Sequence, residues 1–229
     1  MNAPLRRIAA AAGLAVLSLA SSASWAASYT YNFNTFFDTS TTTDLLDTKT
    51  LAYSVATLTI SDITGGVQVS LTQNNTAFPA KLGGTILDSL WMGGVNGTLA
   101  NVSGTKVTGS TFSTTSPKVM DAGYTYPWCI SFSSILLGGG ISEGGTSTFK
   151  ITGSGVTAAA FAKAAYTPMI DLTNVGSPYN TSFLGLGGGN VHFIGKLATG
   201  AVPEPGTYAL MGLGLVGIGA VMRRRQAAA

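Results

Sequence analysis

The chain has 229 residues and a formal net charge of +3, and its five arginines all lie near the two ends of the sequence. Between Ala27 and Val202 seven lysines stand against eight acidic residues, so this middle part has a net charge near −1. That balance excludes a basic surface for nucleic acid. The single cysteine excludes an intramolecular disulfide, and the length of the middle part suits one packed domain.

The first 26 residues predict a secretory signal peptide. Arg6 and Arg7 form a positive start, residues 8–20 are apolar, and Ser24 and Ala26 place small side chains where a signal peptidase reads them. We therefore expect cleavage after Ala26. The alternative is an uncleaved membrane anchor, for which the apolar stretch is short.

Alternating large apolar and small polar side chains predict the first strand of the body at residues 29–33. A polar loop over residues 38–47 follows. A second alternation covers residues 51–60, but its phase slips by one residue near Ala56, which predicts a β-bulge. Gly65 and Gly66 suit a turn, and the renewed alternation at residues 67–71 makes this the clearest hairpin of the sequence.

The second half of the body is divided by glycine, asparagine and proline into short segments. The apolar segment 86–92 fits either a strand or one or two helical turns. Alanine costs least to place in a helix, and residues 157–166 hold six alanines, so this segment is the one helix predicted in the body. Further strands are predicted at residues 106–113, 128–133, 147–152, 169–174 and 191–197.

These many short strands predict a mainly β fold over residues 27–200, an antiparallel β-sandwich or jelly-roll-like single domain with one short helix. The aromatic side chains of the body indicate a packed core. Some of them could instead be exposed and stack against sugar rings, as in a carbohydrate-binding module. The candidates for such stacking are Trp91, Tyr124, Tyr126 and Trp128.

No catalytic or metal constellation emerges from the sequence. His192 is the only histidine and has no nucleophile motif beside it. His192 and Cys129 together cannot supply the three or four ligands of a zinc site, and the apolar neighbours of Cys129 indicate a small buried side chain. We expect no enzyme activity and no cofactor.

A calcium site is the weaker possibility that the polar loop leaves open. Asp38, Asp44 and Asp47 offer hard oxygen ligands. Their spacing matches no EF-hand loop, so solvated loop acids are the alternative.

The last 29 residues have the order of a sorting tail. Pro203, Glu204 and Pro205 precede 17 uncharged residues, 206–222, and the cluster Arg223, Arg224 and Arg225 follows directly. As a helix, this segment would be about 25 Å long, the short end of what crosses a membrane. The arginines would stay on the cytoplasmic side, which puts the body outside the cytoplasm.

This tail resembles the C-terminal signal of PEP-CTERM proteins, and the resemblance covers about a tenth of the chain. It implies that exosortase, a membrane protease and transpeptidase, removes the tail and passes the protein from the inner membrane to the cell surface or extracellular matrix. The resemblance also implies the source of the protein, since such tails are common in Gram-negative bacteria that produce exopolysaccharide.

We therefore expect an exported surface or matrix protein, associated with exopolysaccharide, in a structural or interaction role without catalysis. Two alternatives stay open. One is the carbohydrate-binding module, and the other is a plain single-pass membrane-anchored envelope protein.

Overall fold

The computed structural model describes residues 26–37, 48–75, 78–80, 84–119, 123–132, 139–176 and 189–198. The chain divides into two compact units, Ala27–Ala201 and the pair of end segments Met1–Ala26 and Val202–Ala229. The predicted signal peptide, the predicted span 206–222 and the polar loop 38–47 lie outside the described residues. Within the described part, no helix is both long and apolar enough to cross a membrane.

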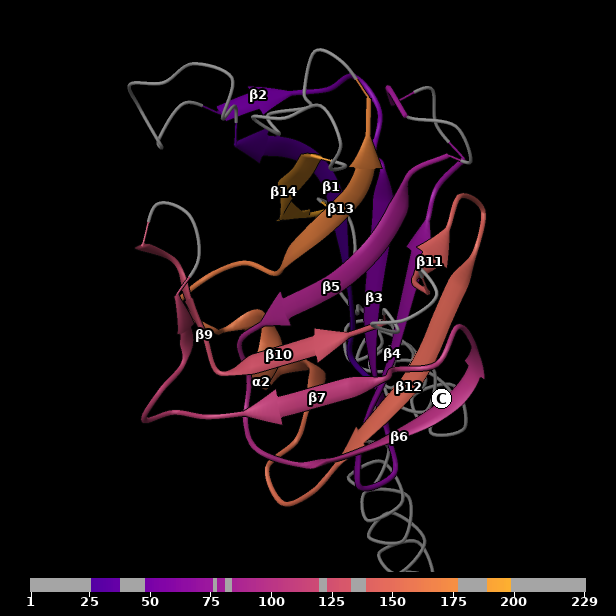
Figure 1. The fold of residues 1–229 in the computed structure, drawn as a ribbon. Helices are drawn as coiled ribbons and strands as arrows, with labels where there is room; N and C mark the ends of the chain where they lie inside the picture. Colours follow the sequence, from indigo (N-terminus) through magenta and orange to yellow (C-terminus); the bar gives the residue numbers. More distant parts are fainter. Residues whose placement is uncertain are drawn as a thin grey trace, which may run out of the picture. The chain divides into compact units, whose positions relative to one another are not determined.

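The described fold is one antiparallel sheet of 12 strands, with a separate pair of two short strands and one short helix (Figure 1). The first six strands are β1 (Ser28–Phe37), β2 (Thr48–Thr50), β3 (Ala56–Ile63), β4 (Gly66–Gln73), β5 (Ile86–Met92) and β6 (Thr98–Gly104). The others in the sheet are β7 (Gly109–Phe112), β10 (Trp128–Ser131), β11 (Ile141–Ser142), β12 (Thr146–Thr152), β13 (Met169–Val175) and β14 (Gly189–Leu197). The separate pair is β8 (Lys118–Val119) with β9 (Thr125–Tyr126), and the helix is α2 (Ala158–Ala162).

The sheet curls until it is nearly closed. Its strand order is β6-β12-β4-β3-β1-β14-β13-β5-β10-β7, with β2 added to β1 and β11 added to β5. The two end strands, β6 and β7, are consecutive in the chain. The link between them forms backbone hydrogen bonds with a strand from each end of the order: the N–H of Thr105 donates to the carbonyl of Thr146 on β12, and the N–H of Thr108 donates to that of Ser131 on β10. In Figure 1 β5, β10 and β7 run across β3, β4 and β12 at an angle, as a curled sheet requires.

The mainly β, antiparallel prediction with one short helix is thus confirmed, but its finer form differs. A sandwich packs two separate sheets, whereas here hydrogen bonds continue from strand to strand through the whole order. The interior of the curled sheet holds the main core. Alternate residues of β3 and β4 point into it, so that Leu58, Ile60, Val67, Val69 and Leu71 are all fully buried.

The phase slip near Ala56 has a cause other than the predicted bulge in one strand. Both β2 and β3 pair with β1: Thr50 lies opposite Thr35, and Ala56 lies opposite Phe33. The residues between them leave the ladder and return, and Val55 donates to the carbonyl of Phe33 where they return. The predicted strand over residues 51–55 is therefore wrong, and the slip marks the change from β2 to β3.

The other predicted elements appear with shifted ends. Segment 86–92 is strand β5, and the hairpin of β3 and β4 turns at Gly65, whose φ is +76°. The predicted helix 157–166 is shortened to α2, where the Thr157 side chain accepts a bond from the N–H of Ala160. Strand β6 was not predicted.

Candidate functional site

A second hydrophobic cluster lies on the outer face of the sheet, opposite the main core. On β13, Ile170 and Leu172 belong to the core, while Met169 belongs to the second cluster. We call this second group the outer cluster. Its members are Phe37, Trp91, Tyr126 and Met169, with Tyr124, Cys129 and Ile194 packed against them.

Three of the four aromatic residues considered for sugar stacking are buried. Trp91 is 5% exposed, Tyr126 0% and Trp128 2%. Trp128 belongs to the main core, where its indole N–H donates to the carbonyl of Val95 at 3.0 Å. Only Tyr124 is half-buried. The four rings therefore form no exposed planar row.

Tyr124 instead belongs to a tyrosine cluster with Tyr126 and Tyr166. Its ring lies 5.0 Å from that of Tyr166 and is stacked on that of Tyr126, with centroids 6.4 Å apart. The hydroxyl of Tyr126 donates to the carbonyl of Thr167 at 2.7 Å, and burial raises the pKa of this hydroxyl above its ordinary value of 10.0. Sequence reasoning missed Tyr166, because it closes an alanine-rich segment that was interpreted as helix.

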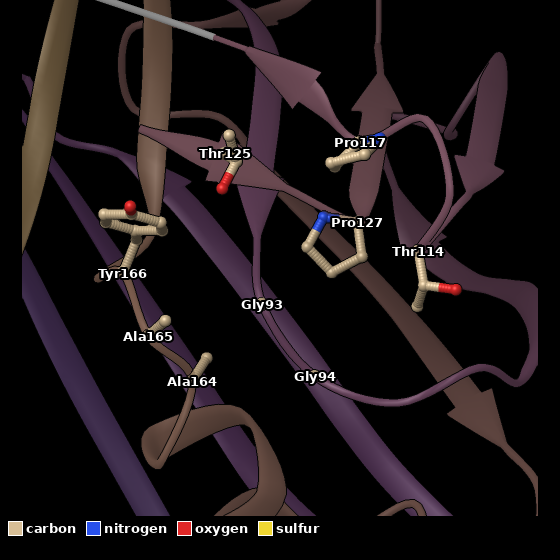
Figure 2. Close-up of a pocket in the computed structure, with 9 residues that line it drawn as sticks. All are labelled: Gly93, Gly94, Thr114, Pro117, Thr125, Pro127, Ala164, Ala165 and Tyr166. Atoms are coloured by element: carbon tan, nitrogen blue, oxygen red, sulfur yellow. The ribbon is translucent and has the colours of Figure 1, made fainter. Parts of the chain in front are cut away.

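An open cleft of about 280 Å³ lies beside Tyr166. Figure 2 shows Tyr166 and the alanines before it on one side, and two prolines and Thr114 on the other. The lining residues are Gly93, Gly94, Thr114, Pro117, Thr125, Pro127, Ala164, Ala165 and Tyr166. None of them is charged, so the cleft suits a neutral ligand better than an ionic one.

Two glycines shape this cleft. A Cβ at Gly93 would overlap the Cβ of Ala164, and a Cβ at Gly94 would overlap the ring of Phe161. The φ of Gly94 is +123°, which few other residues adopt. The glycines therefore let the segment after α2 approach the end of β5, and this brings Tyr166 to the cleft.

His192 is paired with an acid by the strand register. Asp171 lies opposite His192 on the neighbouring strand, and the Nε2 of His192 is 3.7 Å from Oδ1 of Asp171. Asn190 donates to the other carboxylate oxygen at 2.9 Å. On its other side, Asp171 lies opposite Ser89 of β5. A serine-histidine-acid triad needs the histidine between the other two, whereas here the acid is in the middle.

Metal ligands do not gather in the part of the chain that the structure describes. There, no three side chains of histidine, cysteine, aspartate or glutamate come together. Asp38, Asp44 and Asp47, the calcium candidates, lie outside the described residues. Cys129 is half-buried against the outer cluster.

Residues 201–225 match the model of the PEP-CTERM protein-sorting motif. The match covers Pro203, Glu204 and Pro205 together with Arg223, Arg224 and Arg225, so the predicted sorting motif is confirmed. No curated protein and no solved structure matches the chain. The chain thus carries the sorting signal of an exosortase substrate, and the match does not extend into the folded body.

Proposed function

We propose that this protein is an exported surface or extracellular-matrix component of a Gram-negative bacterium, sorted by exosortase and associated with exopolysaccharide, in a structural role without catalysis. The sorting motif at residues 201–225 is the observation that carries the proposal. The tail is a transient partner of exosortase in the inner membrane, and the body is the part that remains at the surface.

The body supports a structural role in two ways. Its sheet is nearly closed, so few strand edges remain open to pairing with other chains. In addition, the order of Ser89, Asp171 and His192 across three strands lacks the geometry of a hydrolytic triad. A structural protein outside the cell benefits from the nearly closed sheet, because it limits unwanted pairing with other chains. Such a role needs no active site.

Mass spectrometry of the mature C-terminus, combined with cell fractionation, tests the sorting. In cells with an active exosortase, the wild-type protein should lack residues 206–229 and should be found outside the inner membrane. The variant Glu204→Ala changes the Pro-Glu-Pro motif and should remain at full length in the inner membrane. A full-length wild-type protein in the inner membrane of the same cells would instead identify a plain single-pass anchor.

A second candidate function, saccharide binding, is favoured by the cleft beside Tyr166. One exposed aromatic ring, two prolines and two threonine hydroxyls line an uncharged hollow. Such a surface can stack against a neutral sugar ring and donate hydrogen bonds at its rim. Tyr166, not Trp91 or Trp128, is then the residue that would meet the sugar, since the two tryptophans are buried.

Co-sedimentation with the exopolysaccharide of the producing strain tests this candidate. Tyr166→Ala should weaken the retention of the protein, while Tyr53→Ala should not, because Tyr53 is similarly exposed, 38% against 36%, but does not line the cleft. Thermal unfolding of both variants shows whether each is folded. Equal retention of the two folded variants would remove the cleft from the proposal.

A further inference from the structure

Asp62 joins the first residue of the folded unit to two other segments. Its Oδ2 accepts a hydrogen bond from the backbone N–H of Ala27 at 3.0 Å, and its Oδ1 accepts one from the N–H of Ala158 at 2.6 Å. In return, the N–H of Asp62 donates to the carbonyl of Ala27 at 2.8 Å. Ala27 is partly buried against the core, whereas Ala26 is exposed.

The nitrogen that Asp62 holds is the one that signal peptidase is expected to release. The folded unit begins at Ala27, and the sequence predicts cleavage after Ala26. Hydrolysis of that peptide bond adds a hydroxyl group to the carbonyl carbon of Ala26 and a proton to the nitrogen of Ala27. With an ordinary pKa of about 7.7–8.0, the new amine takes up a further proton at neutral pH and becomes an ammonium group.

We propose that Asp62 is the binding site for the α-ammonium group of the mature chain, which forms when the signal peptide is removed after Ala26. The proposal depends on export and on that cleavage, and it is independent of how the C-terminal tail is processed. In the precursor the carboxylate meets a neutral amide, and in the mature protein it meets a cation with three donors.

The surroundings make Asp62 the natural counter-ion. The start of β1 is packed by β3, β14 and α2. The charged or titratable side chains on these elements and at the helix end are Asp62, Lys196, Lys163 and His192, and His192 pairs with Asp171. Among the described groups on these elements Asp62 is the single acid. On β1 itself, the residues nearest to Ala27 with a polar side-chain tip include Tyr29 and Tyr31, which are not acids of the carboxyl type. A charge-assisted hydrogen bond is roughly twice as strong as a neutral one.

The pair would also fix an important strand. In the sheet, β1 lies between β3 and β14, and it also carries β2. An ion pair at its first residue therefore holds the start of a central strand and, through Ala158, the start of α2. Removal of the signal peptide would then stabilise the exported fold as well as release it.

The test uses the mature protein isolated from the cell envelope. N-terminal sequencing should give Ala27 as the first residue. Growth of the cells with ¹³C-labelled alanine labels the Cα and Cβ of Ala27 and leaves its amine unmodified, and NMR then follows these signals through a pH titration. We expect the α-amine to titrate at least about half a unit above its ordinary value, because a carboxylate lies beside it.

Two variants separate an ion pair from a merely structural role. In Asp62→Asn the titration should return to the ordinary range, and in Asp88→Asn, which changes a half-buried acid on β5, it should not change. If Asp62→Asn does not accumulate, the wild-type shift should shrink between low and high salt. A first residue other than Ala27, or an ordinary α-amine titration in the wild type, would overturn the proposal.

Discussion

At the end of β4, the amide of Gln73 is 1% exposed and all of its polar atoms are used. Its Nε2 donates to the carbonyl of Thr85 at 3.0 Å and to the Thr85 hydroxyl at 2.7 Å, while its Oε1 accepts from the N–H of Leu87 at 2.9 Å. The Thr85 hydroxyl in turn donates to Glu143 at 3.0 Å. A single buried side chain thus ties β4 to the start of β5.

Replacing Gln73 with leucine should therefore lower the free energy of unfolding by about 2–4 kcal/mol, because backbone groups of Thr85 and Leu87 lose their partner inside the fold. The control is Gln68→Leu on the exposed face of the same strand, which should change stability by about 0.5 kcal/mol or less. Urea denaturation measures both. Similar losses in the two variants would show that the buried bonds contribute nothing specific.

Tyr126 predicts how the protein responds to alkaline pH. Burial, and secondarily the neighbouring Tyr124 and Tyr166, raise the pKa of its hydroxyl above 10.0, and burial likewise raises the pKa of Tyr31. The unfolded chain therefore loses these protons at a lower pH than the folded one. The stability that the neutral phenols provide is complete below about pH 10 and is lost as the pH rises further.

The free energy of unfolding should accordingly fall as the pH rises above about 10, as measured by urea titration at each pH. Tyr126→Phe should be less stable at pH 8 by about 1 kcal/mol, since the bond to Thr167 is lost. Its decline above pH 10 should be shallower than that of the wild type. Parallel declines would mean that Tyr126 does not titrate with unfolding.

At the scale of elements, the β3–β4 hairpin contains two adjacent glycines with different requirements. Gly65 has a φ of +76° and open space around it, so Gly65→Ala should cost about 1 kcal/mol through backbone strain alone. A Cβ at Gly66 would overlap the carbonyl oxygen of Ile151, where β12 pairs with β4. Gly66→Ala should cost more, about 2–3 kcal/mol.

Thermal and urea unfolding of the two variants gives their order. A suitable reference is Gly155→Ala, since Gly155 also has a positive φ, +73°, with nothing near its Cβ position. It should resemble Gly65→Ala. A Gly66→Ala variant as stable as these two would show that the backbone of β12 can shift away from β4 at that point without loss of stability.

The sequence predicted those elements whose two faces differ. In β3, β4 and β12, buried and less buried residues alternate, so the period-2 pattern is visible in the chain. Strand β6 carries no such signal, since it is largely exposed along its length at one end of the sheet order. Helix α2 ends early because the chain after it turns toward Gly93, a contact that alanine content does not report.

The candidate site was less accessible to sequence reasoning. An aromatic residue in a strand gives the same sequence pattern whether its face of the sheet is covered by other side chains or exposed to solvent. The burial of Trp91 and Trp128 depends on tertiary contacts, so the sequence could not predict it. The pairing of Asp171 with His192 follows from the register of β13 and β14, 21 positions apart in the chain. The sorting motif, by contrast, is local, and the sequence alone sufficed to find it.

For the whole molecule, charge reports which segments remain attached. The complete chain has a sequence isoelectric point near 9.0, since it has 12 lysines and arginines against nine acids. All five arginines lie in the predicted targeting segments. Without the signal peptide but with the tail, seven lysines and three arginines stand against nine acids, and the charge is near +1. Without the signal peptide and residues 206–229, seven lysines stand against nine acids, and the charge is near −2.

Isoelectric focusing of the surface fraction should therefore give a single acidic species, because processing at both ends removes every arginine. The Glu204→Ala variant should instead accumulate in the membrane fraction as a basic species, since it keeps Arg223, Arg224 and Arg225 and lacks one acid. A basic protein at the surface of cells with an active exosortase would contradict removal of the tail. The charge of the mature form thus provides a readout of both processing events that needs no assumption about what the body binds.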